Sequence, residues 1–398
     1  MKILICGIDG YIGYPLALHL MRRGHQIYGL DNYSRRALVA ASGSNSLTPI
    51  LERREREKYL SGDYGFPELV ARIDLTDEYN TSRVLNHFEP DAIVHLAEQP
   101  SAPWSMKNVL TSVDTQRGNV LGTLSLLWAM KEQCPNAHLV KLGTMGEYGT
   151  PECDIPEGEI PESGVGASYM RGYCPCYEEG YECPMKGLPF PRSPGSFYHL
   201  SKVHDTYNII FACKTWGLRS TDIMQGVVFG VGIEDDTSPE ELTRFDYDQY
   251  FGTVINRFCT QAIIGHPLTI YGTGDQIRGY IPLKDSIQCL TIALENPPPA
   301  GEYRTFNQFE SIKSINDLAL YVFIAGDILG IPVRCEHLPN PRTEASRHYY
   351  NPSHQKLFDL GYTPTLDFQL EVFKLMKSIL PYENRVIKEV IMPTTTWK

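Results

Sequence analysis

The chain begins Met1-Lys-Ile-Leu-Ile-Cys-Gly7-Ile-Asp-Gly10-Tyr-Ile-Gly13, and this stretch decides the fold. Residues 2–6 form a short apolar run of the kind found in buried parallel strands. The three glycines allow a tight turn, a close approach of backbone to a ligand, and close packing of the next helix on the strand. Residues 15–23 favour that helix, which we expect to end at Gly24. The stretch therefore predicts the strand, loop and helix that open a nucleotide-binding fold.

A carboxylate at the end of the second predicted strand extends this pattern. The run Gln26-Ile-Tyr-Gly-Leu30 is followed by Asp31, and a carboxylate about 20 residues after the glycines binds the adenosine ribose in dinucleotide-binding folds. Its charge repels the 2′-phosphate of NADP, while the helix N-terminus binds the pyrophosphate. Arg35 and Arg36 follow closely, and their charges would act in the opposite direction. We expect NAD as the cofactor.

Strand-like and helical runs continue to alternate along the first half of the chain. Strands are expected to end at residues 74, 97 and 143, and one of the helices between them covers 119–131. This alternation predicts an α/β fold, a Rossmann-type doubly wound parallel sheet whose ligands lie at the carboxyl ends of the strands. We expect an NAD-binding domain at 1–226 and, at 227–398, mainly a smaller C-terminal lobe that binds the substrate.

Two segments interrupt the alternation. Residues 52–58 form a charged run, which we interpret as a solvated helix face. Residues 151–195 are rich in proline and glycine and contain Cys153, Cys174, Cys176 and Cys183. A long insert of this kind is typical of a lid or binding loop. Four thiolates could form a zinc site, but their spacing is not the usual Cys-x2-Cys, so we expect no metal.

Composition excludes several classes of function. A net charge of −11 argues against nucleic acid and anionic membranes as partners. No stretch approaches the 18 or so uninterrupted apolar residues of a membrane span, and the first strand leaves no room for a leader peptide. Ten cysteines over this length do not form a small secreted framework. We therefore expect a cytoplasmic enzyme that acts on small molecules.

The stretch Ser196-Phe-Tyr198-His-Leu-Ser-Lys202 predicts the chemistry. Tyr-x-x-x-Lys on a helix places the two side chains one turn apart on the same face. A nearby cation favours the phenolate, and such a tyrosine can take a proton from an alcohol while hydride leaves the same carbon. The other interpretation, a Tyr/Lys pair facing solvent, loses weight beside the nucleotide-binding pattern.

Taken together, the glycines, Asp31, Thr144 and the Tyr198/Lys202 pair resemble the extended short-chain dehydrogenase/reductases (NAD-dependent epimerases and dehydratases) that act on nucleotide sugars. Longer segments resemble the UDP-sulfoquinovose synthase family, which converts UDP-glucose and sulfite to UDP-sulfoquinovose; they are residues 97–106, 143–150, 196–205, 225–230, 251–257, 271–280 and 348–351. The resemblance covers nearly the full length except most of 151–195. It implies oxidation at C4, loss of water to a 4-keto-5,6-ene, addition of sulfite at C6 and reduction at C4, in a homodimer with bound NAD.

The resemblance also implies roles for individual residues. Thr144, Tyr198 and Lys202 are expected to act at C4. Glu147 is the first candidate for the base at C5, the alternative being a structural carboxylate that holds its loop. His199 either protonates the leaving hydroxyl or binds sulfite, or else simply packs. Sugar hydroxyls are assigned to Gln99, Ser101, Thr144 and Gln225, and the UDP pyrophosphate to Arg278 and Arg342. NAD is assigned to Gly7, Gly10, Tyr11, Ile12, Gly13, Asp31, Asn32, Arg35, Asp74, Leu75, Leu96, Ala97, Asn119, Tyr198, Lys202 and Gln225.

Departures from related patterns leave alternatives open. Pro100 stands where the synthase family commonly has arginine, a possible ligand for anionic sulfite. Met145-Gly146 follows Thr144 where 4,6-dehydratases have Asp-Glu, which argues against a standard 4,6-dehydratase. One alternative is a 5,6-dehydratase that forms an exo-glycal, or a C4 epimerase, without sulfite addition. A non-catalytic NAD-sensing protein is a third, but such a protein has no use for the tyrosine, lysine and threonine together.

Overall fold

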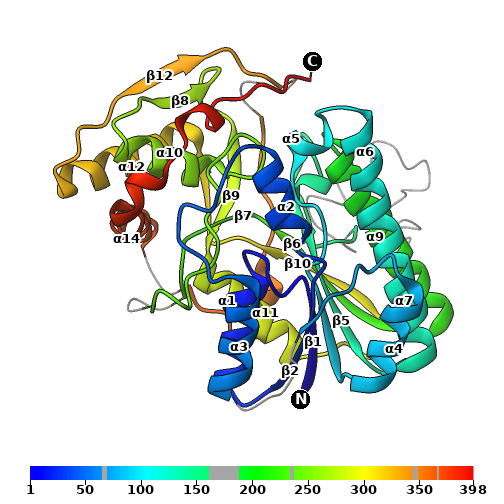
Figure 1. Cartoon of the computed structure of the whole chain (residues 1–398). Helices are drawn as coiled ribbons and strands as arrows, with labels where there is room; N and C mark the ends of the chain where they lie inside the picture. Colours follow the sequence, from blue (N-terminus) through cyan, green and yellow to red (C-terminus); the bar gives the residue numbers. More distant parts are fainter. Residues whose placement is uncertain are drawn as a thin grey trace, which may run out of the picture.

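The centre of the molecule is a seven-stranded sheet in which all neighbouring strands run parallel (Figure 1). The computed structural model describes residues 1–64, 70–160, 188–233, 237–342, 345, 348–364 and 367–397. The strand order is β10-β6-β5-β4-β1-β2-β3, with bounds β1 Lys2–Cys6, β2 Gln26–Leu30, β3 Val70–Ala71, β4 Ala92–His95, β5 His138–Thr144, β6 Arg219–Gln225 and β10 Tyr303–Gln308. The order reverses direction at β1, which opens a ligand crevice at the carboxyl ends of β1 and β4. The predicted doubly wound sheet is confirmed.

Helices cover both faces of this sheet because its central strands are apolar on both sides. Ile3 and Ile5 of β1 pack in the core beneath α1 (Gly13–Arg22) and α11 (Leu283–Glu295). Leu4 and Cys6 belong to the opposite core, whose helices are α4 (Glu78–Phe88), α7 (Gly122–Gln133) and α9 (Phe197–Trp216). Figure 1 shows the two helical layers on either side of the strands.

The helix expected at 119–131 starts earlier than the sequence suggested. It continues from α6 (Val109–Gln116) through a π-helical turn at Arg117–Leu121 into α7. Asn108 caps its N-terminus with a capping box. A single π turn inside an α-helix is frequent at functional sites, and this one carries Asn119.

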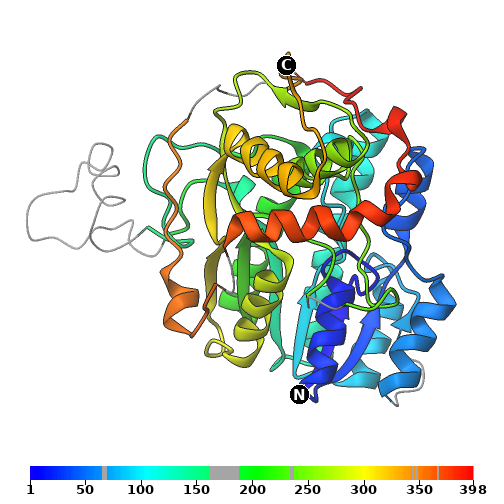
Figure 2. The same ribbon diagram turned by 90° about the vertical axis from the view of Figure 1, so that its left-hand side faces the viewer.

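The second lobe contains two small sheets and a group of helices. One sheet joins β7 (Val227–Phe229), β9 (Ile277–Pro282) and β11 (Ser311–Ser314), and the other joins β8 (Leu268–Tyr271) and β12 (Cys335–Leu338). Helices α10 (Val254–Ile263), α12 (Ile315–Leu329) and α14 (Phe368–Ile379) share one core, and Figure 2 shows α12 and α14 above the main sheet. However, β10 and α11 come from the same half of the chain and belong to the main sheet. The segment after residue 226 therefore contributes to both lobes.

The insert between Thr144 and Tyr198 is described only at its two ends. Ile155 pairs with Pro352, and Glu159 pairs with Pro189. Cys174, Cys176, Cys183 and most of the expected lid lie outside the described residues, whereas Cys153 is buried. In the described part of the chain, no group of three or more His, Cys, Asp or Glu side chains is arranged to hold a metal ion. None of the described helices is both long and apolar enough to span a bilayer.

The charged run at 52–58 was interpreted as a solvated helix face, and this is wrong for one residue. The run lies in α3 (Arg53–Tyr64), but the Arg56 side chain is only 3% exposed. Its Nη1 donates to Asp9 Oδ1 at 2.8 Å, and its guanidinium lies 3.6 Å from the centre of the Tyr14 ring. Arg56 thus ties α3 to the glycine loop.

Candidate active site

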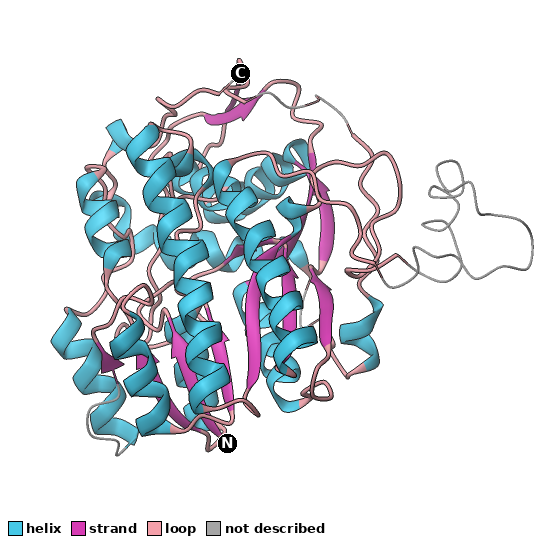
Figure 3. Cartoon of the chain, turned by 90° about the vertical axis from the view of Figure 1, so that its right-hand side faces the viewer, coloured by secondary structure: helices cyan, strands magenta, loops and turns pink. Residues whose placement is uncertain are grey.

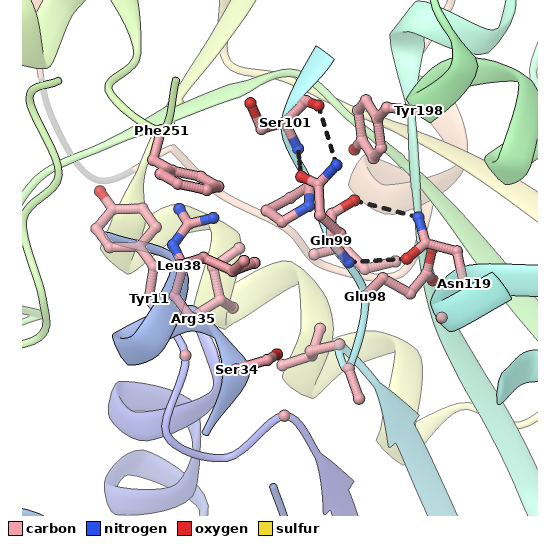
Figure 4. A pocket seen from close by; sticks show the side chains of 18 of the residues that line it. Tyr11, Ser34, Arg35, Leu38, Glu98, Gln99, Ser101, Asn119, Tyr198 and Phe251 are labelled. Atoms are coloured by element: carbon pink, nitrogen blue, oxygen red, sulfur yellow. Dashed lines mark hydrogen bonds between the residues drawn. The ribbon is translucent and has the colours of Figure 1, made fainter. Parts of the chain in front are cut away.

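A cavity of about 740 Å³ lies at the carboxyl ends of the central strands. Figure 4 shows Tyr198, Glu98 and Asn119 on one wall and Tyr11, Arg35 and Phe251 on the facing wall. All the residues assigned to NAD from the sequence line this cavity, as do Gln99, Ser101 and Thr144. Four assigned residues are not among its lining: Glu147, His199, Arg278 and Arg342.

The glycine loop between β1 and α1 has no room for side chains. Gly7 has a φ of +87°, and a Cβ there would lie 2.8 Å from the carbonyl carbon of Leu96. A Cβ on Gly13 would lie 2.2 Å from the Gly7 oxygen. Glycine is required at both positions, and the loop presents bare backbone to the cavity at the N-terminus of α1. This geometry suits a pyrophosphate.

Asp31 follows β2 and is oriented by two backbone donors. Its Oδ2 accepts a hydrogen bond from Asp9 N at 2.8 Å, and its Oδ1 accepts one from Tyr33 N at 2.7 Å. Burial, reinforced by the nearby Asp9 carboxylate, raises the pKa of Asp31 to about 6. Each oxygen keeps a second lone pair that can accept a ribose hydroxyl. Nearby, Asn32 donates to Asp74 at 2.7 Å.

The two arginines that follow Asp31 have protein partners. Arg36 makes a bidentate pair with Asp9, at 2.7 and 2.8 Å. Arg35 donates to Asp246 at 2.9 and 3.1 Å and stacks over Phe251, 4.0 Å from its ring centre. Both arginines therefore have carboxylate partners, although the charge of Arg36 still acts to lower the pKa of Asp31.

Tyr198 lies near the start of α9, which Ser196 caps by accepting a hydrogen bond from His199 N at 3.2 Å. The Tyr198 backbone N–H donates to Ser105 Oγ at 3.0 Å. Burial and the carboxylates of Glu98 and Glu147 raise the pKa of Tyr198, while the Thr144 hydroxyl opposes that rise. The fold therefore brings Tyr198 and Thr144 together at one end of the cavity.

Lys202 has a partner that the sequence did not reveal. Its Nζ lies 2.7 Å from Glu98 Oε2 and donates to the Leu142 carbonyl at 2.6 Å. The same Nζ lies 6.0 Å from the centre of the Tyr198 ring. The expectation that Lys202 by itself lowers the pKa of Tyr198 is wrong for this structure, because Glu98 balances the lysine charge and burial dominates.

Asn119, Gln99 and Ser101 form a hydrogen-bonded wall of the cavity (Figure 4). Asn119 exchanges side-chain hydrogen bonds with the backbone of Gln99, at 2.8 and 3.1 Å, and donates to Ser201 Oγ at 2.9 Å. Gln99 Nε2 donates to Thr115 Oγ1 at 2.8 Å. Ser101 Oγ donates to the Tyr250 carbonyl and caps the short helix α5 (Ala102–Ser105). These hydrogen bonds hold the Ser101 side chain in the cavity wall, and its role as a sugar ligand stays a prediction.

Gln225, at the end of β6, was assigned to both NAD and sugar. Its Nε2 donates to Ser286 Oγ of α11 at 2.9 Å, and the residue lines the cavity. Its amide oxygen is therefore the part of the side chain that can serve a ligand as acceptor.

Glu147 does not fit the role of base at C5. Its side chain is fully buried and does not line the cavity. Oε1 lies 3.5 Å from Lys141 Nζ, and Oε2 accepts a hydrogen bond from Thr206 Oγ1 at 3.1 Å. The short 3₁₀ turn Met145–Glu147 directs this side chain behind β5. The alternative weighed from the sequence, a structural carboxylate, fits this placement.

His199, Arg278 and Arg342 lie near one another outside the cavity lining. The His199 ring is 5.0 Å from the Tyr198 ring, and its Nδ1 lies 3.0 Å from Ser196 Oγ. Burial and the charges of Arg342 and Arg278 lower the pKa of His199 to about 3. The imidazole is therefore neutral at physiological pH.

A third arginine, Arg257 of α10, belongs to the same group and was not assigned from the sequence. It donates to Tyr271 Oη at 2.6 Å and to the Thr269 carbonyl at 3.2 Å. Burial, together with the charges of Arg257 and Arg278, lowers the pKa of Arg342 to about 10. Within the described residues, neither Arg257 nor Arg342 has a carboxylate partner. Three arginine side chains gathered in one place indicate an anion site.

Three residues of the site were missed by sequence reasoning: Glu98, Asp9 and Arg257. Asp9 and Arg257 lie within motifs that drew attention for their neighbours, and Glu98 begins the Glu-Gln pair of the 97–106 segment. Their partners come from distant segments, so no local spacing identifies their roles.

Comparisons with known proteins agree with this architecture. Residues 3–173 match the NAD dependent epimerase/dehydratase family. Among solved structures, the chain superposes on UDP-glucuronic acid 4-epimerase from Bacillus cereus, in complex with UDP-glucuronic acid and NAD. The TM-score is 0.67 at 20% identity, over 95% of this chain and 99% of the other, which supports the fold alone.

Two curated relatives match along the whole chain. UDP-sulfoquinovose synthase of Sulfolobus acidocaldarius is 42% identical, with 100% of this chain and 98% of the relative covered. The chloroplastic UDP-sulfoquinovose synthase of Spinacia oleracea is 44% identical, with 100% of this chain and 79% of the relative covered. The chain therefore belongs to the UDP-sulfoquinovose synthases, within the NAD dependent epimerase/dehydratase family.

Proposed function

We propose that this protein converts UDP-glucose and sulfite to UDP-sulfoquinovose with NAD held in its cavity. The observation that carries the proposal is that Tyr198, Lys202 and Thr144 line the same cavity as the glycine loop and Asp31, in a chain 44% identical to a synthase of that name. No observation favours a C4 epimerase, an exo-glycal-forming dehydratase or an NAD-sensing protein over this reaction.

The cavity residues fit NAD. Bare backbone at Gly7, Gly10 and Gly13 suits the pyrophosphate, and the oriented Asp31 carboxylate suits the two ribose hydroxyls that NAD leaves unmodified. When bound, NAD accepts a hydride from the sugar and returns it, so the overall reaction needs no external oxidant.

Tyr198 is the proposed acid and base at the C4 oxygen. It takes the hydroxyl proton during oxidation and gives it back during reduction, and the Thr144 hydroxyl holds the same oxygen in place. Thr144 ends β5 and Tyr198 lies in the first turn of α9, so both line the cavity at the carboxyl ends of the strands, where ligands of this fold bind.

The arginine group, Arg257, Arg278 and Arg342, is the proposed site for the UDP pyrophosphate. Guanidinium groups bind phosphate oxygens in bidentate pairs. Burial lowers the pKa of each of these arginines, so an arriving dianion relieves an unfavourable accumulation of charge. The group adjoins His199, so the sugar would extend from it toward Tyr198.

His199 is the proposed proton carrier between C5 and C6. Its ring lies 5.0 Å from the Tyr198 ring, and burial together with the nearby arginine charges keeps the imidazole neutral at physiological pH. A neutral imidazole can take the acidic C5 proton of a 4-ketone and then deliver it to the departing C6 hydroxyl. The neighbouring arginines would attract sulfite to the same place.

A homodimer is the proposed assembly. Large apolar side chains lie exposed along α6, α7 and α9, including Leu110 at 71% and Phe211 at 61% exposure. These helices lie side by side on the face shown in Figure 3. A contiguous apolar face of this kind marks an interaction site, and two copies would cover it by packing these helices against their counterparts. A cytoplasmic location stays a prediction of the sequence.

The reaction is tested by incubating the purified protein with UDP-glucose and sulfite, without added NAD. Mass spectrometry should detect UDP-sulfoquinovose at the expense of both substrates. An altered sugar without consumption of sulfite would reject the sulfonation step, and an unaltered sugar would reject the function as a whole.

A further inference from the structure

A group of buried charged side chains surrounds Lys202, and of its members Glu98 and Lys202 reach the wall of the cavity. It draws on every element packed around this lysine: the loop after β4, β5, the 3₁₀ turn, β6 and α9, with Arg192 close by. Its members are His95, Glu98, Lys141, Glu147, Arg192, Lys202, Asp205 and Asp222. Thr206 and Tyr303 add neutral hydrogen bonds to Asp222, at 2.7 and 3.0 Å.

The charges of this group do not balance if every carboxyl is ionised. The cations are Lys141, Lys202 and Arg192, because burial lowers the pKa of His95 to about 4 and keeps that imidazole neutral. The carboxyl groups are Glu98, Glu147, Asp205 and Asp222, one more than the cations. A net charge buried in the protein interior is strongly unfavourable. One carboxyl group therefore carries a proton.

Asp205 and Glu98 are the carboxyl groups placed to share that proton. Asp205 is completely buried, with 0% of its surface exposed. Neither of its carboxyl oxygens accepts a hydrogen bond from a donor among the described residues. It lies in hydrogen-bonding contact with the Glu98 carboxyl, and burial and Glu98 raise its pKa well above the usual range. Two carboxyl groups in contact cannot both ionise, so they hold one proton between them.

The pair is connected to the reacting end of the cavity through Lys202. Glu98 Oε2 lies 2.7 Å from Lys202 Nζ, and Glu98 also lines the cavity. An ammonium can accept a proton at one hydrogen-bonded position only as it gives one up at another. Lys202 can thus pass a proton between the Tyr198 side of the cavity and Glu98 without changing its own charge.

Resting on the proposed function, we propose that Glu98 and Asp205 form an internal proton store for the oxidation and reduction at C4. As the O4–H bond breaks, its proton passes to Tyr198, the phenol proton passes to Lys202, and a lysine proton passes to Glu98. The hydride leaves C4 in the same step. When hydride returns to C4, the three proton transfers reverse, and O4 recovers its proton. Glu98 and Asp205 are positioning and proton-holding residues, because in this path they exchange protons with Lys202 and not with the sugar.

This store has a thermodynamic signature that can be measured. If the O4 proton leaves for solvent, the ratio of reduced to oxidised bound cofactor rises about tenfold for each pH unit. If the proton stays in the protein, the ratio is independent of pH. The enzyme with its bound NAD is mixed with UDP-glucose in the absence of sulfite, and the reduced nicotinamide is measured by absorbance from pH 6 to pH 9, roughly the range between the ordinary pKa values of histidine and tyrosine.

We expect a flat profile for the wild type and a rise of about tenfold per pH unit for Glu98→Gln, which removes the carboxylate that takes the proton from Lys202. Asp205→Asn leaves that carboxylate in place and should stay flat. Asp205→Asn is expected to fold, since an amide is close in shape to the protonated acid that it replaces. Glu157→Gln is the control, because Glu157 is a buried carboxyl bound instead to Asn307 N and Lys356 N; its profile should stay flat. A wild-type slope of about tenfold, or a flat profile in Glu98→Gln, would overturn the proposal. Absence of reduced cofactor at every pH would reject the oxidation itself, and this proposal with it.

Discussion

The ammonium of Lys202 lies 2.7 Å from the Glu98 carboxylate, so the charge of the motif lysine is balanced before any ligand binds. Burial then keeps Tyr198 protonated in the free site, because it raises the phenol pKa. The Tyr-x-x-x-Lys spacing places the two residues correctly, but the electrostatics of the site depend on a carboxylate from the loop after β4.

Replacing Tyr198 with phenylalanine removes the group that takes the C4 hydroxyl proton. We expect UDP-glucose turnover to fall by about 10²–10⁴-fold, the usual contribution of a general acid–base group, while bound NAD is retained. Tyr207→Phe, on the same helix but 48% exposed, is the matched control. Product formation is followed by mass spectrometry. Wild-type turnover in Tyr198→Phe would refute the assignment.

Asp31 should make the choice between NAD and NADP depend on pH. Its pKa is raised to about 6, so the carboxylate is charged above that pH and neutral below it. The carboxylate therefore repels the 2′-phosphate of NADP at pH 8, and this repulsion is weaker at pH 5. A loss of roughly 1 kcal/mol of repulsion corresponds to an about fivefold smaller preference for NAD over NADP. Dissociation constants of both cofactors for the cofactor-free protein check this.

The 2′-phosphate itself titrates near pH 6, so Asp31→Asn serves as the reference. Its preference for NAD over NADP should be weaker at pH 8 and should change less with pH than that of the wild type. An identical pH profile in the two proteins would exclude Asp31 as the discriminating group.

Arg56 should contribute much more to stability than Arg53, although both belong to the same charged run of α3. Arg56→Ala leaves the buried Asp9 with Arg36 as its remaining partner, and breaking a buried pair costs about 3–5 kcal/mol. Arg53 pairs with Glu57 at the surface, where such i,i+4 pairs contribute about 0.3–0.5 kcal/mol. Urea unfolding measures both. Equal losses would contradict the buried role of Arg56.

Removal of Arg257 should weaken UDP binding. We expect Arg257→Leu to raise the dissociation constant of UDP about tenfold or more, as a charge-assisted hydrogen bond contributes about 1.5–3 kcal/mol, with a weaker salt dependence than the wild type. Arg304→Leu is the control, since that arginine binds Thr221 Oγ1 at the other end of the sheet. Calorimetric titration with UDP distinguishes them. Unchanged affinity in Arg257→Leu would remove this residue from the proposed pyrophosphate site.

The apolar face of α6 and α9 should hold the dimer together. A charge at its centre, as in Phe211→Glu, should give monomers in analytical ultracentrifugation, because an unpaired carboxylate would be buried in the interface. Leu320→Glu places the same charge on α12, where Leu320 is 55% exposed, and should leave the assembly unchanged. A wild-type protein that is already monomeric would contradict the proposed homodimer.

Local sequence patterns located most of the fold and much of the cavity. The strands 2–6 and 26–30, the glycine loop and Asp31 follow directly from apolar runs and turn requirements near one another in the chain. Partnerships between distant segments could not be read in the same way: Lys202 with Glu98, Asp9 with Arg36 and Arg56, and Arg257 with its group. A run of charged residues on a helix does not reveal which of its side chains is buried, because residues only one turn apart can face either the core or the solvent.

Glu147 shows a second limit of sequence reasoning. Its position beside Thr144 suggested catalysis, but a 3₁₀ turn rotates successive side chains by about a third of a turn. That rotation directs Glu147 toward Lys141 instead of the cavity. Distance along the chain therefore could not establish which carboxylate faces the ligand.

The central claim is that one bound NAD removes and returns the same hydride while sulfite is added to UDP-glucose. The most direct test is the mass spectrum of the product formed from sulfite and UDP-glucose labelled with deuterium at C4, with unlabelled NAD in the protein. We predict UDP-sulfoquinovose that keeps the deuterium at C4. A sulfonated product without the label, or no sulfonated product at all, would contradict the account.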